Sequence, residues 1–432
     1  MISTLNSHKK YGLLLSLYLA QSIPMSFFST VVPVIMRMEN YSLASIGMLQ
    51  LIKVPWILKF LWAPFIDRAS PTNHHYKRWI IGSEVAYAAV IIAIGFFQLS
   101  SDFSTIIVLM IGAFVLSATQ DIASDALAVK ILSSGQRSYG NSMQSAGSFM
   151  GTLIGSGVLL YLYAVLGWQN LLLVLAGFVL LAIIPLRLIR KDRSTVVIPK
   201  KRVGLKSIPG FFRQAGAGRR VLFLSLIYSG LIGMLAMMKP FMVDAGYSVK
   251  QIAFIAGIFG TSFGAAGALL GGHLLHLWGK KKAIRRFALY GSMAAVFMAV
   301  IAFQSTVANW LIYPAVALVW SAYALASTAV YTISMEMVRE HTEGTDYSLQ
   351  IIVSHLSGIL VAIGSGKLAD VIGYSGLFTI EAIIGISVAL ATPWLYREVI
   401  GTSRPKGVKV HFFHPPVTKT PNSSKEIIKT DK

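Results

Sequence analysis

Two carboxylates lie one helical turn apart in a segment that is otherwise mostly apolar. The stretch TQDIASDALAVK, residues 119–130, carries Asp121 and Asp125 and is closed by Lys130. Residues four apart on a helix lie on the same face, so the two acids point the same way. A charge at the centre of a membrane helix costs about 2.5–3.5 kcal/mol on insertion scales, so such a pair indicates a function.

Two interpretations of the pair stay open from the sequence. In the first, Asp121 and Asp125 form ion pairs with Lys59 and Lys130 and hold two helices together as an inner gate. In the second, one carboxylate takes up a proton on one side of a membrane and releases it on the other. The candidates for proton coupling or for the inner gate are Asp121, Asp125, Glu84, Lys59 and Lys53.

The composition places these charges in a membrane protein. Of the 432 residues, 55% are hydrophobic and 13% are charged, whereas a soluble protein carries about 25% charged residues. Apolar blocks of about 20 residues are long enough to cross a bilayer as helices. We expect twelve spans, at about 11–36, 43–66, 79–99, 104–129, 138–163, 169–189, 221–243, 250–277, 283–303, 309–335, 346–372 and 376–396.

The basic residues predict the topology. Most of the 38 Lys and Arg lie in or beside alternate loops, and only Arg37 and Lys250 lie at the other side. This bias predicts that both termini are cytoplasmic, and it explains the net charge of +21 without a nucleic-acid partner. Membrane lipid is the further partner that it suggests. The first span is too long, and too polar at Gln21, for a cleaved signal peptide, and we predict a multi-pass protein of a bacterial inner membrane.

The longest basic loop divides the chain into two halves. The predicted domains are six-helix bundles at 1–189 and 221–397, a basic cytoplasmic linker at 190–220 and a disordered cytoplasmic tail at 398–432.

An internal repeat supports this division. The tetrapeptide IGSG occurs at 154–157 and again at 363–366. Each copy is followed by a glycine–aromatic pair, Gly167–Trp168 and Gly373–Tyr374. The two copies fall in the fifth and the eleventh predicted spans, which are equivalent positions in two six-helix halves.

Four sequence blocks resemble a known family of transporters. They are KFLWAPFIDR (59–68), TQDIASDALAVKIL (119–132), GTLIGSGVLLYLYAVLGW (151–168) and GTDYSLQ (344–350). Together they resemble the major facilitator superfamily and, within it, the group of muropeptide permeases and acetyl-CoA transporters. The last block is more similar to the siderophore permeases typified by the rhizobactin and pyochelin importers.

The resemblance implies an all-α membrane protein with twelve transmembrane helices in two pseudo-symmetric six-helix halves. It implies an importer of a siderophore, as its ferric chelate, that is coupled to protons and works by alternating access. The alternatives are an importer of muropeptides or other cell-wall fragments and an efflux pump for amphipathic compounds. We expect a monomer without cofactor or resident metal, and no enzyme, because the chain has no phosphate-binding loop and no zinc-protease motif.

The same resemblance implies gates at the helix ends. A loop with an Asp-Arg pair and further basic residues, at 59–79, ties helix ends together in one state and releases them in the other. The equivalent loop at 271–282 has His276 where an acid is expected, and a shorter version at 366–374 suggests an outer gate. The gate candidates are Asp67, Arg68, Lys77, Arg78, Lys367 and Asp370.

Small residues predict where helices approach closely. Glycines recur at intervals of three or four in two spans that face one another in this fold. They serve either ordinary packing or a sliding surface between the halves, and they are Gly147, Gly151, Gly155, Gly260, Gly264, Gly267 and Gly271.

Aromatic and amide side chains predict the substrate cavity. Collectively they suggest a large, partly aromatic or amphipathic ligand more than a simple sugar or an inorganic ion. The candidates are Gln21, Phe28, Trp56, Gln144, Tyr228, Trp320, Tyr323, Tyr331, Gln350 and His355.

Overall fold

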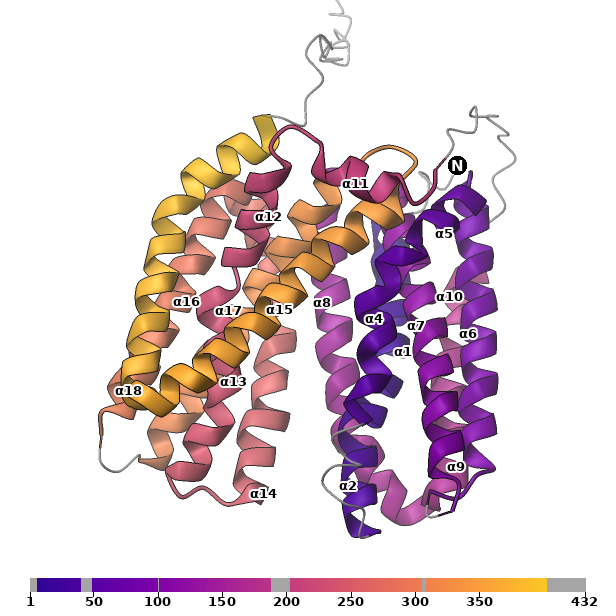
Figure 1. Cartoon of the computed structure of the whole chain (residues 1–432), viewed down its shortest axis with the longest axis horizontal. Helices are drawn as coiled ribbons and strands as arrows, with labels where there is room; N and C mark the ends of the chain where they lie inside the picture. Colours follow the sequence, from indigo (N-terminus) through magenta and orange to yellow (C-terminus); the bar gives the residue numbers. More distant parts are fainter. Residues whose placement is uncertain (1–5, 40–48, 100, 188–202, 305–307, 402–432) are drawn as a thin grey trace, which may run out of the picture.

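The structure is a computed structural model of the chain, and it describes residues 6–39, 49–99, 101–187, 203–304 and 308–401. Within these ranges every regular element is a helix, as predicted. Figure 1 shows two helical bundles side by side. We call them the N bundle, residues 6–187, and the C bundle, residues 217–401.

The N bundle alternates long helices with short irregular ones. Pro55 and Pro64 lie in the first turns of α4 and α5, where the fixed φ of proline suits a helix start but ends the turn before it. The second predicted span is therefore broken into short pieces. In chain order the elements are α1 (Ser7–Ser26), η2 (Phe27–Val31), α2 (Val32–Met38), η3 (Leu49–Lys53), α4 (Val54–Leu58), η4 (Lys59–Leu61), α5 (Ala63–Ala69), α6 (Asn73–Gly95), α7 (Phe103–Ile131), α8 (Arg137–Leu153), η5 (Ile154–Val158), α9 (Leu159–Leu181) and α10 (Ile183–Arg187).

The C bundle follows a short connecting helix, α11 (Ser207–Phe212). Both α11 and the first turn of α12 lie within the segment predicted as a linker, 190–220. The predicted tail is helical as far as Gly401, and residues 188–202 and 402–432 lie outside the described residues. The elements are α12 (Ala217–Leu226), α13 (Ser229–Asp244), α14 (Val249–Ile252), η6 (Ala253–Phe259), α15 (Gly260–Trp278), α16 (Lys280–Ala302), α17 (Asn309–Glu336) and α18 (Glu343–Gly401).

Nine helices of the described chain are long and apolar enough to cross a membrane. Two of the nine, at 137–186 and 343–394, are 50 and 52 residues long, whereas one crossing needs about 20. Each contains a glycine with left-handed backbone, Gly167 at φ 70° and Gly373 at φ 71°. Figure 1 shows α18 doubling back on itself.

These two glycines are the equivalent positions of the predicted repeat, and each long helix corresponds to two predicted spans. The span predicted at 43–66 is not among the nine, because it begins outside the described residues and is divided into short pieces. The count of twelve and the cytoplasmic termini stay predictions.

In the part of the chain that the structure describes, the two bundles meet at one end. They approach one another at the end that carries the N-terminus and α11, and they separate toward the end that carries α2 and α14 (Figure 1). We call these the closed end and the open end. Ser142 on α8 donates a hydrogen bond to the carbonyl of Ala268 on α15 at 2.7 Å, so the fifth and eighth predicted spans do face one another.

Glycines make two different kinds of close approach. A Cβ built on Gly147, Gly151 or Gly155 would collide with the backbone of α1, so this face packs inside the N bundle rather than on the C bundle. Gly272 on α15, in contrast, leaves room for Ser142 across the bundle interface. The sequence left ordinary packing and a sliding surface open, and the structure assigns the glycines of α8 to packing within the N bundle.

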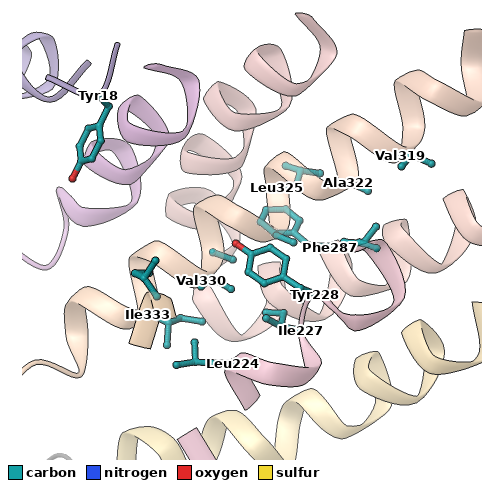
Figure 2. Packing of buried hydrophobic residues seen from close by; sticks show 14 of the residues in the cluster. Tyr18, Leu224, Ile227, Tyr228, Phe287, Val319, Ala322, Leu325, Val330 and Ile333 are labelled. Atoms are coloured by element: carbon teal, nitrogen blue, oxygen red, sulfur yellow. The ribbon is translucent and has the colours of Figure 1, made fainter. Parts of the chain in front are cut away.

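Each bundle has an apolar core of its own. In the C bundle, Tyr228 lies among aliphatic side chains from α12 and α17, including Leu224 and Val330 (Figure 2). In the N bundle, Phe28 packs against Phe114 with ring centroids 6.4 Å apart. Tightly packed cores deform little, so each bundle is suited to move as one body.

Candidate functional site

A cavity of about 670 Å³ lies between the bundles. On α1 and η2 its lining runs from Tyr18 to Thr30, which is about 18 Å along a helix. Its inner wall carries Asp121 and Asp125, and the bundles close beyond them. The cavity therefore has a floor of charged residues toward the closed end and a mouth toward the open end.

Asp121 is held by two partners on the floor. The ammonium of Lys59 forms a buried ion pair with Asp121 Oδ2. Gln21 Nε2 donates to Asp121 Oδ1 at 2.7 Å. The structure thus contains the Lys59–Asp121 pair that the gate interpretation predicts, and it places this pair on the cavity wall.

Asp125 is held differently. The hydroxyl of Tyr18 donates a hydrogen bond to Asp125 Oδ1, and Gln144 Nε2 lies 3.5 Å from the same oxygen. The other end of the Gln144 amide, Oε1, accepts a bond from Tyr347 of the C bundle at 3.1 Å. One amide side chain therefore links a buried carboxylate of the N bundle to the C bundle.

Of the other charged candidates, Lys130 and Glu84 lie away from the central cavity. Lys130 does not pair with the acids of α7; its ammonium lies 3.6 Å from Glu343 of the C bundle, because it points from the end of α7 toward the start of α18. Glu84 is buried at 1% exposed and does not line the cavity. Lys53 does line it, one helical turn before Trp56.

Hydroxyl and amide groups cover the N-bundle wall. On α1 and η2 they stand at Ser22, Ser26 and Thr30, and on α8 at Gln144, Ser148 and Thr152. The spacing of four keeps each set on one helix face. The sequence contains this spacing, but the prediction rested on aromatic and amide residues and did not include the serines and threonines. We call the two sets the hydroxyl ladders of α1 and α8.

The C-bundle wall is mostly aliphatic. It carries two polar side chains, Tyr331 and His355, and His355 is open to the cavity. The aliphatic residues that line it are Ile232, Ile351, Ile352, Leu356 and Ile359. The cavity therefore presents one polar, charged wall and one apolar wall to a ligand.

The ten predicted substrate residues divide into three groups. Trp320 and Tyr323 line a smaller neighbouring cavity of about 240 Å³ together with Phe149. Those on the wall of the central cavity are Gln21, Trp56, Gln144, Tyr331 and His355.

The remaining three are placed away from both cavities, and we correct their assignment. Phe28 is buried in the N-bundle core, and Tyr228 is buried in the C-bundle core against Tyr323, with ring centroids 5.6 Å apart. Gln350 donates to the carbonyls of Ser334 and Asp346, at 3.1 and 3.0 Å, which fixes the first turns of α18 to α17.

Asp67 joins the bundles at the closed end. Its carboxylate accepts hydrogen bonds from the backbone N–H groups of Gly344 and Thr345, at 3.0 and 2.8 Å, and from the Thr345 hydroxyl at 2.6 Å. Tyr76 donates to it from its own bundle at 2.8 Å. An anion at the N-terminus of α18 is also favoured by the helix dipole, so Asp67 is suited to hold the closed end shut.

The other predicted gate residues do not join Asp67. Arg68 and Arg78 are exposed, and Lys77 is half-buried. Lys367 and Asp370, which were predicted as an outer gate, are exposed near the open end, and their gate role stays a prediction. A contact that the sequence did not predict adds to the closed end: Lys280 forms an ion pair with Glu336, and Ser134 of the N bundle donates to the same carboxylate at 3.4 Å.

The chain matches known proteins over most of its length. The family model described as Major Facilitator Superfamily matches residues 14–362. The anhydromuropeptide permease of Escherichia coli (strain K12) is 23% identical over 399 residues, which cover 89% of this chain and 78% of the relative. "Putative transporter AmpG 4" of Rickettsia felis is 22% identical over 398 residues, covering 88% and 95%.

The fold is shared with solved transporters. The E. coli fucose:proton symporter superposes with a TM-score of 0.67 at 13% identity, covering 89% of this chain and 98% of the symporter. The comparisons favour the muropeptide alternative and do not support the siderophore branch. The sequence blocks mark the wider group of transporters, and they were too general to identify the cargo.

Proposed function

The chain belongs to the Major Facilitator Superfamily and is a secondary transporter, and we propose that it imports muropeptides in symport with protons across a bacterial inner membrane. The observation that carries the proposal is the central cavity, whose floor holds two buried carboxylates, Asp121 and Asp125, the second of which is linked to the C bundle through Gln144 and Tyr347. The names of the relatives supply the cargo class.

The cavity suits the chemistry of a muropeptide, which is a sugar unit that carries a short acidic peptide. Its volume lies within the range of about 300–1,000 Å³ of small-molecule sites. The hydroxyl ladders of α1 and α8 match sugar hydroxyl and amide groups, and Lys53 offers a cation to a peptide carboxylate. The aliphatic C-bundle wall covers the apolar faces of the cargo.

Coupling rests on Asp125 and Gln144. When Asp125 binds a proton, the acceptor of the Tyr18 hydroxyl loses its charge, and the hydrogen bond weakens. Gln144 then turns between Asp125 and Tyr347 of the C bundle. The proton is thereby linked to a contact between the bundles, which is what symport requires of a two-state transporter.

In alternating access, the contacts at the closed end break while the open end closes. With cytoplasmic termini, the mouth of the cavity faces the periplasm, and cargo enters there. Release into the cytoplasm requires Asp67 to leave Gly344 and Thr345, and Lys130 to leave Glu343, while the open end closes.

Transport into proteoliposomes tests the proposal. Purified protein is reconstituted with an outside-acid pH gradient, and a radiolabelled anhydromuropeptide is added outside. We expect accumulation above the outside concentration that a protonophore abolishes. Empty liposomes and labelled fucose are the controls. Absence of protein-dependent uptake would show that the muropeptide is not the cargo. Accumulation that the protonophore does not reduce would show that transport is not coupled to protons. Extrusion of preloaded muropeptide under the same outside-acid gradient would indicate proton antiport and would reject import.

A further inference from the structure

A second cavity opens on the outer flank of the N bundle. It measures about 520 Å³, and its lining includes Ala69 of α5, five residues of α6 and Thr119 of α7. Those of α6 are His75, Arg78, Trp79, Gly82 and Ser83. None of its lining residues borders the central cavity. Figure 1 shows α6 on the side of the N bundle that faces away from the C bundle, so this cavity faces the surroundings of the protein.

The chemistry of this cavity suits an anion. Arg78 is exposed and presents a guanidinium, and the indole of Trp79 adds a ring N–H group. His75, whose Nδ1 shares a 2.8 Å hydrogen bond with the Thr72 hydroxyl, donates from Nε2 when Nδ1 is the acceptor of that bond. The described lining contains no Asp or Glu. Gly82 borders the space without a side chain, and a Cβ built on it would meet no atom within 4 Å. A cavity with a cation, N–H donors and no acid is suited to a phosphate group.

The position of the cavity suits a membrane boundary. Helix α6 begins at Asn73, so Arg78 and Trp79 lie within its first two turns, about 8–9 Å along the helix. Tryptophan and basic residues gather at the level of lipid headgroups. The cavity also lies at the closed end, because Tyr76 of the same turn bonds to Asp67.

Apolar side chains continue the cavity toward the middle of the bundle. Val85 follows Gly82 by three residues on α6 and is 49% exposed. Val115 precedes Thr119 by four residues on α7 and is 40% exposed, and Val108 lies further along at 68%. Residues three and four apart share a helix face, so an apolar track runs from the end of the cavity that carries Arg78 along α6 and α7.

We propose that this cavity binds the headgroup of an anionic phospholipid, with Arg78 on the phosphate and the acyl chains along Val85 and Val115. A soluble phosphate would use the same cation, but it would leave the apolar track without a ligand. The track therefore favours a lipid over a free anion. A bound headgroup would contact α5, α6 and α7 together, next to the elements that hold Asp67 at the closed end.

Native mass spectrometry of the full-length protein tests this inference. Protein in detergent is titrated with phosphatidylglycerol or, as a neutral-headgroup comparison, with phosphatidylcholine. We expect tighter binding of phosphatidylglycerol and, in Arg78→Gln, affinity that is about fivefold weaker, as expected for loss of one cation near a headgroup. Arg285→Gln is the matched control, since Arg285 is an exposed basic residue near the start of α16 in the C bundle; it should bind as wild type.

A second variant keeps the inference testable if Arg78→Gln does not fold. Gly82→Leu fills the cavity from its open wall and keeps the guanidinium, and it should also weaken phosphatidylglycerol binding. Equal binding of phosphatidylglycerol by wild type and both variants would overturn the site. Protection against heat by glycerol 3-phosphate, lost in Arg78→Gln, would assign the cavity to a soluble phosphate and overturn the lipid proposal.

Discussion

The two walls of the central cavity differ in kind. The N-bundle wall carries Lys59, Asp121 and Asp125 together with two ladders of hydroxyl and amide groups, while the C-bundle wall is mostly aliphatic. The C bundle does contain a buried acid, Glu381, but this residue lies behind the wall, next to Ser365 and Gly233. The two halves share a fold and a repeat without sharing their chemistry.

This difference assigns separate tasks to the two bundles. Buried charges are stable only when partners satisfy them, and the carboxylates of Asp121 and Asp125 are satisfied by Lys59, Gln21 and Tyr18. Among the described residues, one hydrogen bond connects this network to the C bundle: the Tyr347 hydroxyl donates to Gln144, which in turn lies beside Asp125. We infer that proton and cargo chemistry reside in the N bundle, and that the C bundle supplies a surface that closes over the cargo.

Among the variants that test this difference between the bundles, removal of Lys59 should have the largest effect, and the effect is on stability. The variant Lys59→Met leaves Asp121 buried without its cation, and we expect a loss of about 3–5 kcal/mol in the free energy of unfolding. The double variant Lys59→Met/Asp121→Leu should regain most of this loss, because no charge is then left unpaired. Thermal unfolding in detergent measures both. Equal stability of Lys59→Met and wild type would show that the pair does not stabilise the N bundle.

The second-largest effect is expected from loss of the contact between Asp67 and α18. The variant Asp67→Asn loses charge-assisted hydrogen bonds of about 1.5–3 kcal/mol, so the equilibrium should shift about 10–100-fold away from the state with a shut closed end. Because the chain has no cysteine, Ser148→Cys alone reports the accessibility of the cavity to an impermeant maleimide. We expect slower labelling in Asp67→Asn and unchanged labelling in Asp244→Asn, whose partner Tyr374 lies in its own bundle. Faster labelling would contradict this role of Asp67.

Asp125→Asn should uncouple transport. One symported proton supports about tenfold accumulation per pH unit, and we expect the accumulation ratio to fall to about one while exchange of labelled for unlabelled muropeptide continues. Asp102→Asn, near the start of the same helix, is the matched control and should accumulate as wild type. Persistent accumulation in Asp125→Asn would move the coupling role to Asp121, and loss of exchange as well would indicate a cargo-binding role instead.

The sequence predicted the helices and the charged floor, because both depend on local patterns. Long apolar blocks define crossings, and acids four apart share a face, so Asp121 and Asp125 were found from spacing alone. The glycine–aromatic pairs were found from the repeat, and they are the points where two long helices double back.

Helix rotation and partner choice could not be predicted in the same way. A membrane helix is apolar on its packed face and on its lipid face, so periodicity did not show that Phe28 points into a core. Lys130 is near Asp125 in sequence, yet it pairs with Glu343 because that residue comes from the other bundle at the closed end. Pairs separated by more than 200 residues depend on how two bundles dock, which local patterns do not record.

Glu381→Gln should have the smallest effect and is the sharpest test of the difference between the bundles. Glu381 Oε1 accepts a hydrogen bond from Ser365 at 2.8 Å, and a glutamine side chain of the same shape retains that acceptor. We expect accumulation within about twofold of wild type and a change in unfolding free energy of less than about 1 kcal/mol, as for a single neutral hydrogen bond. Glu381→Leu is the comparison variant, because it removes the acceptor and leaves Ser365 without this partner. A loss of accumulation in Glu381→Gln comparable to that of Asp125→Asn would place a second proton site in the C bundle, and the division of tasks between the two bundles would then be wrong.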